Sequence, residues 1–194
     1  MTSPLGTVVV TGAAGQVGRT VRTGLQGLAT RVVLADLVEI PDPGPAEESL
    51  LLDVRDQTAV LAALAGADAV VHLGGIPDEA PLLDLLTSNV LGTHHILEAA
   101  RVHSLRRVVP ASSNRLTGYY PTTQEVSPTD LPRPDGPYGV SKAAMEALAS
   151  STPTSSPSQS SACAQAASNQ PHPDPSTAPP GSAQGTAPAS STPP

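Results

Sequence analysis

The chain contains no Phe and no Trp, and its only aromatic residues are Tyr119, Tyr120 and Tyr138. A single cysteine, Cys163, excludes a disulfide framework and a thiolate metal cluster. No run approaches the roughly 20 apolar residues of a membrane helix, and no positive segment precedes the first apolar run, so no secretory signal is expected. The net charge of −7, without a basic run, argues against a nucleic-acid partner. We expect a cytoplasmic protein that binds neither membrane nor metal.

The last part of the chain lacks the residue types that build a core. Residues 151–194 contain no Leu, Ile, Val, Met, aromatic residue, Lys or Arg, and ten of the 22 prolines fall there. A segment without large apolar side chains cannot offset the entropy lost when it becomes ordered. The sequence therefore predicts a folded domain over residues 1–150 and a disordered tail, rich in Ser, Pro, Ala and Thr, over residues 151–194.

Within residues 1–150, short apolar runs alternate with stretches of helical periodicity. Strands are predicted at residues 7–10, 31–36, 50–54, 69–73 and 107–112. Helices are predicted at residues 15–28, 58–64, 81–103 and 138–149. Alternating strands and helices form βαβ units, which give a parallel sheet with right-handed crossovers. The expected fold class is α/β, with a doubly wound parallel sheet.

A glycine-rich turn follows the first predicted strand. Gly12, Gly15 and Gly18 lie in the run TGAAGQVG, which opens a helix, and Asp36 ends the second strand 18 residues after Gly18. This context is the one that a dinucleotide site requires, with the pyrophosphate at a helix N-terminus. Asp36 would accept hydrogen bonds from a ribose and repel a 2′-phosphate, which favours NAD over NADP. The alternatives are a plain glycine turn and, for Asp36, a capping residue.

A second group of polar residues lies further along the chain. Tyr138 and Lys142 are four residues apart, so they share one helix face. An ammonium group there would lower the pKa of the phenol and make it a usable general base. Ser112 and Ser113 end the fifth predicted strand, at the sheet edge where ligands bind in open α/β folds. The Tyr-x-x-x-Lys pattern alone is common. It becomes informative because the same chain also contains the glycine-rich turn.

Together these motifs resemble the extended short-chain dehydrogenase/reductase family, the NAD-dependent epimerase/dehydratases, which have a Rossmann-type fold. The resemblance covers about residues 6–150 and is strongest to the uronate dehydrogenase branch. Its pieces, in family order, are TGAAGQVG (11–18), Asp36, LDV (52–54), HLGG (72–75), NVLGT (89–93), ASSN (111–114), RPDG (133–136) and YGVSK (138–142).

The resemblance implies a role for each matching residue. Tyr138 would be the acid/base, Lys142 would tune it and bind the nicotinamide ribose, and Ser113 would hold the substrate hydroxyl. Substrate contacts would come from Ser112, Ser113 and Asn114. The implied NAD-binding residues are Gly12, Gly15, Gln16, Val17, Gly18, Asp36, Asp53, Val54, Leu73, Gly74, Gly75, Asn89, Tyr138 and Lys142. In the uronate dehydrogenase branch, hydride passes from C1 of a cyclic uronic acid to NAD and leaves an aldarolactone.

Three residues depart from the family pattern. Pro110 lies inside a predicted central strand, where proline removes a ladder hydrogen bond. Pro77 replaces a serine that faces the substrate, and Arg115 replaces a histidine. Two other functions remain open: a nucleotide-sugar epimerase or dehydratase, and an NAD-binding remnant without catalysis.

Family members continue past the Tyr–Lys helix with further strands and a substrate region, which residues 151–194 do not resemble. We therefore expect an incomplete substrate site, an exposed edge at the fifth strand and little turnover. One hypothesis for the change in composition is a reading-frame slip near residue 150, and the alternative is a natural linker. The resemblance also implies a homodimer through the long helix and the Tyr138 helix, although their apolar stripes serve equally well as core.

Overall fold

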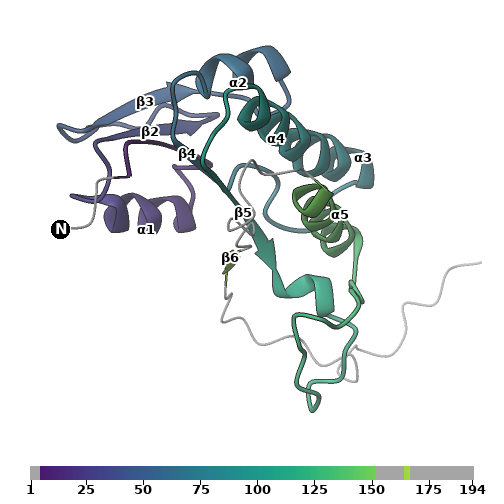
Figure 1. The fold of residues 1–194 in the computed structure, drawn as a ribbon. Coiled ribbons are helices and arrows are strands. Elements are labelled where there is room, and N and C mark those ends of the chain that lie inside the picture. Colours follow the sequence, from purple (N-terminus) through teal and green to yellow (C-terminus); the bar gives the residue numbers. More distant parts are fainter. Residues whose placement is uncertain (1–4, 152–163, 167–194) are drawn as a thin grey trace, which may run out of the picture.

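The structure is a computed structural model and describes residues 5–151 and 164–166. Its centre is a parallel sheet in the order β3-β2-β1-β4-β5-β6 (Figure 1). The strands are β1 (Thr7–Thr11), β2 (Arg31–Asp36), β3 (Glu47–Leu51), β4 (Ala69–His72), β5 (Arg107–Ser113) and β6 (Ala164–Ala166). The strand order reverses between β1 and β4, and such a switch point is where open α/β sheets bind ligands. The predicted doubly wound parallel sheet is confirmed.

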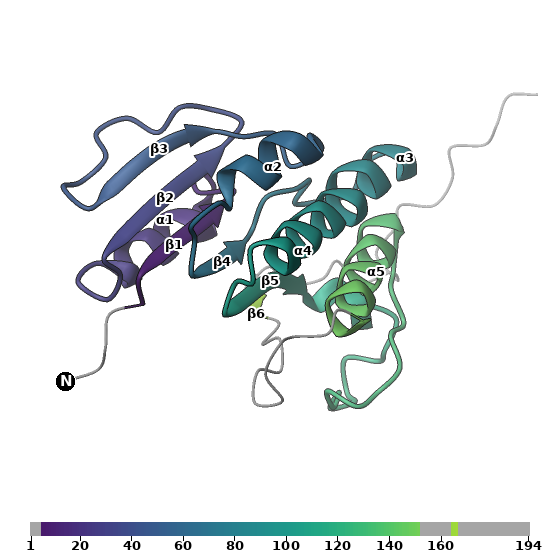
Figure 2. The same ribbon diagram turned by 45° about the horizontal axis from the view of Figure 1, so that its top comes forward.

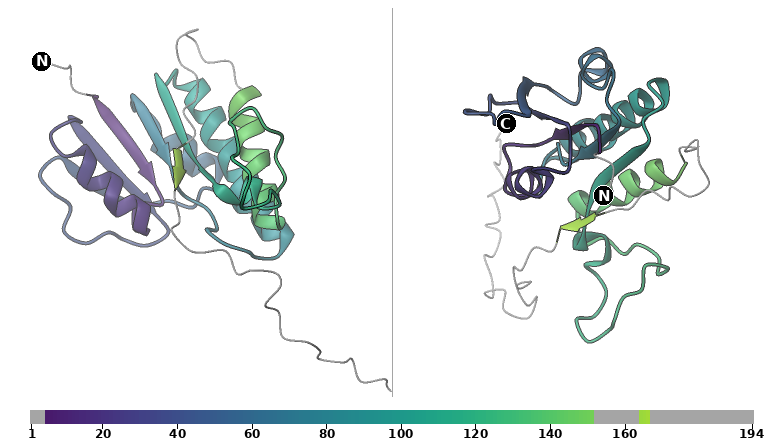
Figure 3. Two further views of the ribbon diagram at one scale, coloured as in Figure 1. Left: turned by 90° about the horizontal axis from the view of Figure 1, so that it is seen from below. Right: turned by 60° about the vertical axis from the view of Figure 1, so that its left-hand side comes forward.

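Helices lie on both faces of the sheet. In the views of Figures 1 and 3, α1 lies on one face, and α2, α4 and α5 lie on the other. The helical segments are α1 (Gln16–Leu25), α2 (Gln57–Ala63), α3 (Leu82–Leu85), the π-helical η1 (Leu86–Leu91), α4 (Gly92–Val102), the 3₁₀ turn η2 (Asn114–Thr117) and α5 (Pro137–Ser151). The loop between η2 and α5 extends away from the sheet (Figure 2).

The alternation of side chains along β1 divides the core into two layers. Val8 and Val10 join the layer that α1 covers, where Val21 and Leu25 pack against them. Val9 points to the opposite face and packs in the layer that contains residues of α2 and α4. A strand buried on both faces explains why residues 7–11 form a run of β-branched side chains without polar alternation. The two layers fix the end of β1, from which the glycine turn leaves.

Two predicted elements have different bounds. The third strand begins and ends earlier than expected, so Asp53 and Val54 lie in the connection after β3. The helix predicted at residues 81–103 consists of α3, η1 and α4, because its middle turn is π-helical. Such single π turns often occur at functional sites. The buried side chain of Asn89 projects from this turn.

Strand β5 continues through Pro110 to Ser113 and pairs with β4 as far as Pro110. Its outer partner β6 runs parallel to Ala111–Ser113, beyond the proline. The expectation that residues 151–194 form no regular structure, leaving β5 as an exposed edge, is therefore corrected at Ala164–Ala166. Backbone pairing accounts for this strand, since it needs no large side chain. The rest of the predicted tail lies outside the described residues.

Helix α5 ends at Ser151, next to the predicted domain boundary. Of the apolar stripe on the long helix, Leu97 is buried in the core, whereas Leu82 and Leu86 are exposed. Homodimer formation stays a prediction.

No helix within the described ranges is long and apolar enough to cross a membrane. Nor do three His, Cys, Asp or Glu side chains gather there as a metal site would require.

Candidate active site

The glycine turn after β1 is packed so closely that side chains would not fit. Gly12 has φ +68°, and a Cβ at this position would lie 2.7 Å from the backbone carbon of Leu73. A Cβ on Gly18 would collide with the carbonyl oxygen of Gly12. Gly15 is the N-cap of α1 and provides no side chain to cap the helix. The first-turn amides of α1 therefore lack a side-chain cap, and the binding of a pyrophosphate there stays a prediction.

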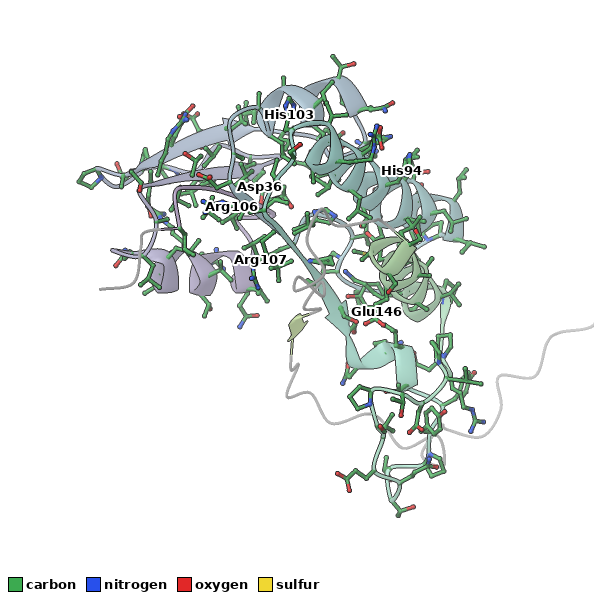
Figure 4. The ribbon with its side chains drawn as sticks, viewed as in Figure 1. Asp36, His94, His103, Arg106, Arg107 and Glu146 are labelled. Carbon is green, nitrogen blue, oxygen red and sulfur yellow. The ribbon has the colours of Figure 1, made fainter. Side chains whose placement is uncertain are left out.

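Asp36 connects the end of β2 to the glycine turn. Its carboxylate accepts hydrogen bonds from the backbone amides of Ala14 (2.9 Å) and Leu37 (2.7 Å). Figure 4 labels this side chain. The carboxylate fixes the shape of the turn and also lines the cleft described next.

A cleft of about 880 Å³ opens at the switch point. Its walls include the glycine turn, the end of β2, the segment after β3 and the segment after β4. The sequence-predicted residues that line it are Gly12, Gly15, Asp36, Asp53, Val54, Leu73, Gly74 and Gly75. Gln16 is exposed at the start of α1, and Gly18 is buried beneath the turn. This cleft lies where a Rossmann-type sheet holds its dinucleotide.

Arg55, which the sequence analysis did not single out, also lines this cleft. Its guanidinium binds both carboxylate oxygens of Asp53, at 2.6–3.0 Å. The hydrogen bonds from Arg55 lower the pKa of Asp53, so this carboxylate is ionised at neutral pH. Asp53 therefore meets a ligand in the cleft as an anion already paired with a cation.

Asn89 ties the cleft to α5. Its side-chain oxygen accepts from the amide of Ile76 (2.7 Å), and its Nδ2 donates to the carbonyl of Ile76 (3.1 Å) and to Oγ of Ser141 (3.0 Å). A Cβ on Gly75 would lie 2.5 Å from the same side-chain oxygen. Asn89 is fully buried and does not line this cleft. Its observed contacts position the segment after β4.

His72 connects three elements beneath the cleft. Its two ring nitrogens lie 2.7 Å from Thr11 Oγ1 and 3.0 Å from Thr93 Oγ1, and the Thr11 hydroxyl accepts from the amide of Gly74 (3.0 Å). Complete burial lowers the pKa of His72 to about 3, with a further contribution from the charge of Lys142. The ring is therefore neutral and links β1, β4 and α4.

The predicted catalytic residues meet in a second cavity of about 430 Å³. Tyr138 and Lys142 line it from α5, and Ser113 lines it from the end of β5. Val17, Ala111 and Pro77 complete part of its wall. Leu73, Gly75, Ile76 and Pro77 line both cavities, so the two are adjacent.

Lys142 lies close to Tyr138, with its Nζ 5.7 Å from the ring centroid, and donates a hydrogen bond to the carbonyl of Ala111 (3.2 Å). The pKa of Tyr138 is nevertheless raised, first because burial disfavours the phenolate. Hydrogen bonding with Ser113 and the charge of Arg115 act in the opposite direction. The pKa of the phenol is therefore raised and not lowered as expected, because burial outweighs the contributions that favour the phenolate.

The two serines at the end of β5 have different partners. Ser112 is buried and donates a hydrogen bond to Glu146, which projects from α5 and is labelled in Figure 4. Ser113 accepts from the amide of Arg115 (3.2 Å) and approaches Asn114 Oδ1 at 3.5 Å. Ser113 is thus the serine whose hydroxyl hydrogen-bonds with the phenol, while Asn114 is exposed at the start of η2. Substrate contacts by all three stay predictions.

A cluster of charged residues beside Tyr138 was not predicted. Arg115 donates to Asp135 (2.8 Å) and to Glu79 (3.1 Å), and Glu79 also accepts from the backbone amide of Tyr138 (3.1 Å). The sequence analysis named Arg115 only as a departure from the family pattern, and it named Asp135 only as part of the run RPDG. No local spacing connects residues 79, 115 and 135, so only the fold reveals the cluster.

A parallel sheet with a glycine turn at its switch point, and a Tyr–Lys pair on the helix after β5, has the architecture of the short-chain dehydrogenase/reductases. The chain belongs to the NAD-dependent epimerase/dehydratase family, whose sequence pattern it matches over residues 8–163. This assignment agrees with the resemblance identified from the motifs.

Several relatives are similar to this chain over part of their sequences. The chain is 44% identical over 142 residues to the uronate dehydrogenase of Agrobacterium fabrum, and 37% identical over 150 residues to that of Pseudomonas putida. These stretches cover 73% and 77% of this chain, but only 54% and 56% of the two relatives. A crystal structure of a uronate dehydrogenase mutant from Agrobacterium tumefaciens, complexed with NAD, is 47% identical with a TM-score of 0.71. The match covers 74% of this chain and 54% of that one. The chain thus spans about half the length of these relatives.

Proposed function

We propose that this chain forms the NAD-binding part of an oxidoreductase that oxidises a sugar acid at C1, converting a uronate to an aldarolactone. The observation that carries the proposal is the adjacency of the two cavities. The larger one has the glycine turn and Asp36, and the smaller one has Tyr138, Lys142 and Ser113. The relatives described as uronate dehydrogenases support the choice of substrate class.

The residues of the larger cleft fit a dinucleotide. Gly12 and Gly18 allow the backbone of the turn to pack against Leu73 and against itself, as the dinucleotide-binding turn requires. Asp36 offers a carboxylate to the ribose hydroxyls and would repel a 2′-phosphate, which favours NAD over NADP. NAD would supply the hydride acceptor. Leu73 and Gly75, which line both cavities, would separate the cofactor from the bulk of the substrate.

The residues of the smaller cavity would remove the proton from the substrate hydroxyl. Ser113 would hold the hydroxyl on C1, and the phenolate form of Tyr138 would accept the proton of this hydroxyl as hydride passes from C1 to NAD. Because the pKa of Tyr138 is raised, the phenol is protonated at neutral pH in the cofactor-free protein. Lys142, with its ammonium 5.7 Å from the ring, would stabilise the phenolate during the reaction. Proton transfer to Tyr138 is therefore expected to favour alkaline pH.

The test is a panel of uronic acids and nucleotide sugars with NAD, followed at the NADH absorbance. The proposal expects slow oxidation of uronic acids by the 194-residue chain, and Tyr138→Phe should abolish it. Product analysis would detect a redox-neutral epimerase, for which the absorbance is silent. Oxidation of a nucleotide sugar but of no uronic acid would contradict the substrate class.

Turnover by the 194 residues themselves remains predicted to be small. A substrate must be held within about 3–3.5 Å of its reaction partner, and a misplacement of about 1 Å can cost on the order of 100-fold. The turnover assay should therefore be accompanied by a separate measurement of NAD binding. Binding of NAD is expected to depend only on the larger cleft.

A further inference from the structure

Three glycines make room for the charged cluster beside Tyr138. A Cβ on Gly136 would collide with the carboxylate of Glu79, and one on Gly118 would collide with the carboxylate of Asp135. A Cβ on Gly139 would collide with the carbonyl oxygen of Arg115. The backbone is thus shaped around these three charged residues, which come from segments far apart in the sequence.

Glu79 stands at the centre of this arrangement. Its Oε2 accepts a hydrogen bond from the amide of Tyr138 at 3.1 Å, in the first turn of α5. First-turn amides have no partner within their helix, and a negative charge there is favourable. The segment after β4 therefore supplies the cap of α5 through the side chain of Glu79.

The other carboxylate oxygen of Glu79 accepts from Arg115 at 3.1 Å. Arg115 in turn donates through Nε to Asp135 at 2.8 Å, just before α5 begins. The side chain of Arg115 is 31% exposed, and this residue lines the cavity that contains Tyr138. One carboxylate thus connects the segment after β4, η2 and the start of α5.

We propose that Glu79 is a positioning residue for Tyr138: it caps the first turn of α5, holds Arg115, and so fixes where the phenol enters the cavity. The importance of this position rests on the proposed acid/base role of Tyr138. Glu79 itself does not line either cavity, so it acts through the tyrosine and Arg115 and does not touch the substrate.

The charges around Tyr138 affect the pKa of its phenol, which a purely structural contact would leave unchanged. The negative charges of Asp78 and Glu79 raise the pKa of the phenol, whereas Arg115 and the hydrogen bond with Ser113 lower it. Lys142 is a further charged group close to the ring. Removing the charge of Glu79 or of Arg115 should therefore shift this pKa in opposite directions.

The experiment measures two properties of the full chain by NMR, namely hydrogen exchange at the Tyr138 amide and titration of the Tyr138 ring. Glu79→Ala should raise the exchange rate about tenfold, as expected for the loss of a hydrogen bond to a charged group. Glu79→Gln retains an acceptor oxygen, so it should preserve most of the protection while lowering the phenol pKa. Arg115→Gln should raise the phenol pKa.

Glu98→Gln is the matched control, because Glu98 pairs with Arg101 on α4 and belongs to neither cavity wall. It should change neither property. The proposal is overturned if Glu79→Ala leaves exchange at Tyr138 at the control rate. It is also overturned if Glu79→Gln and Arg115→Gln shift the phenol in the same direction, as loosening of the fold would do. Neither NAD nor a sugar is present, so this result is independent of the test of the proposed function.

Discussion

The cleft around the glycine turn and the cavity around Tyr138 are built by different means. The glycine turn is formed by backbone atoms and small residues within a single βα unit, with Asp36 from the adjacent strand. The Tyr138 cavity depends on charged side chains from the segments after β4, β5 and η2. The first region follows from local sequence, whereas the second requires the whole sheet to be assembled.

This difference has a consequence for sensitivity to mutation. Substitutions in the glycine turn are expected to destabilise the fold through steric clashes, because the neighbouring backbone atoms cannot move without disturbing the sheet. Errors in the Tyr138 cavity act through hydrogen bonds and charges, which individually contribute only about 1–3 kcal/mol. The following predictions probe this contrast, beginning with the largest expected effect.

Gly12→Ala should destabilise the fold by at least about 2 kcal/mol, since it combines a positive φ with a collision against the backbone of Leu73. Urea denaturation measures the loss, and binding of NAD should fall with it. Gly24→Ala is the matched control. A Cβ at Gly24 meets nothing within 4 Å, and alanine in the last turn of α1 should be neutral or stabilise by up to about 1 kcal/mol. Equal effects at both glycines would contradict the steric account.

Glu146→Ala should cost about 1–3 kcal/mol, because it leaves the buried hydroxyl of Ser112 without this acceptor. The double variant Ser112→Ala/Glu146→Ala removes the donor as well and should recover part of the loss. Denaturation of the wild type, both single variants and the double variant gives the coupling energy. Strict additivity would show that the hydrogen bond contributes nothing.

Acid should destabilise the protein through His72. Its pKa is about 3 in the folded protein, compared with about 6.5 when unfolded, so the unfolded state binds the proton first. This contribution is complete above about pH 6.5 and is lost as the pH falls toward 3, at up to about 1.4 kcal/mol per pH unit. His72→Gln cannot titrate and should show a flatter dependence of unfolding free energy on pH. Parallel curves would exclude His72 as the cause.

Asp36→Asn should have the smallest effect on the fold, because an amide oxygen can still accept from Ala14 or Leu37. Its effect on the cofactor should be selective. Loss of the negative charge is expected to improve NADP binding about tenfold relative to NAD, and paired titrations measure the ratio. An unchanged ratio would remove Asp36 from the account of cofactor preference.

Much of the first region was predictable from sequence. β-branched runs marked the buried strands, and the spacing of Gly12, Gly15 and Gly18 marked the turn, because both signals lie within a few residues. The start of β3 was misplaced, since Glu47 and Glu48 on this edge strand break the apolar run by which a strand is recognised. The π turn at Asn89 was not predicted, and the contacts of this side chain with Ile76 and Ser141 join residues far apart in the sequence, which no local pattern indicates.

For the cavity around Tyr138, the sequence predicted which residues take part but not their contacts. Tyr138 and Lys142 were identified by spacing, but burial of the phenol reversed the expected direction of its pKa shift. The local sequence did not show that the two adjacent serines have different partners. In the structure, Ser112 donates a hydrogen bond to Glu146. Arg115 and Glu79 come together through the packing of three segments, and no periodicity reports such a contact.

The most direct test of the central claim is calorimetric titration of the unmodified 194-residue chain with NAD and, separately, with NADP. The account predicts one NAD bound per chain, with weaker binding of NADP, because the glycine turn and Asp36 are complete within the described residues. No binding of NAD, or equal affinity for the two cofactors, would contradict it.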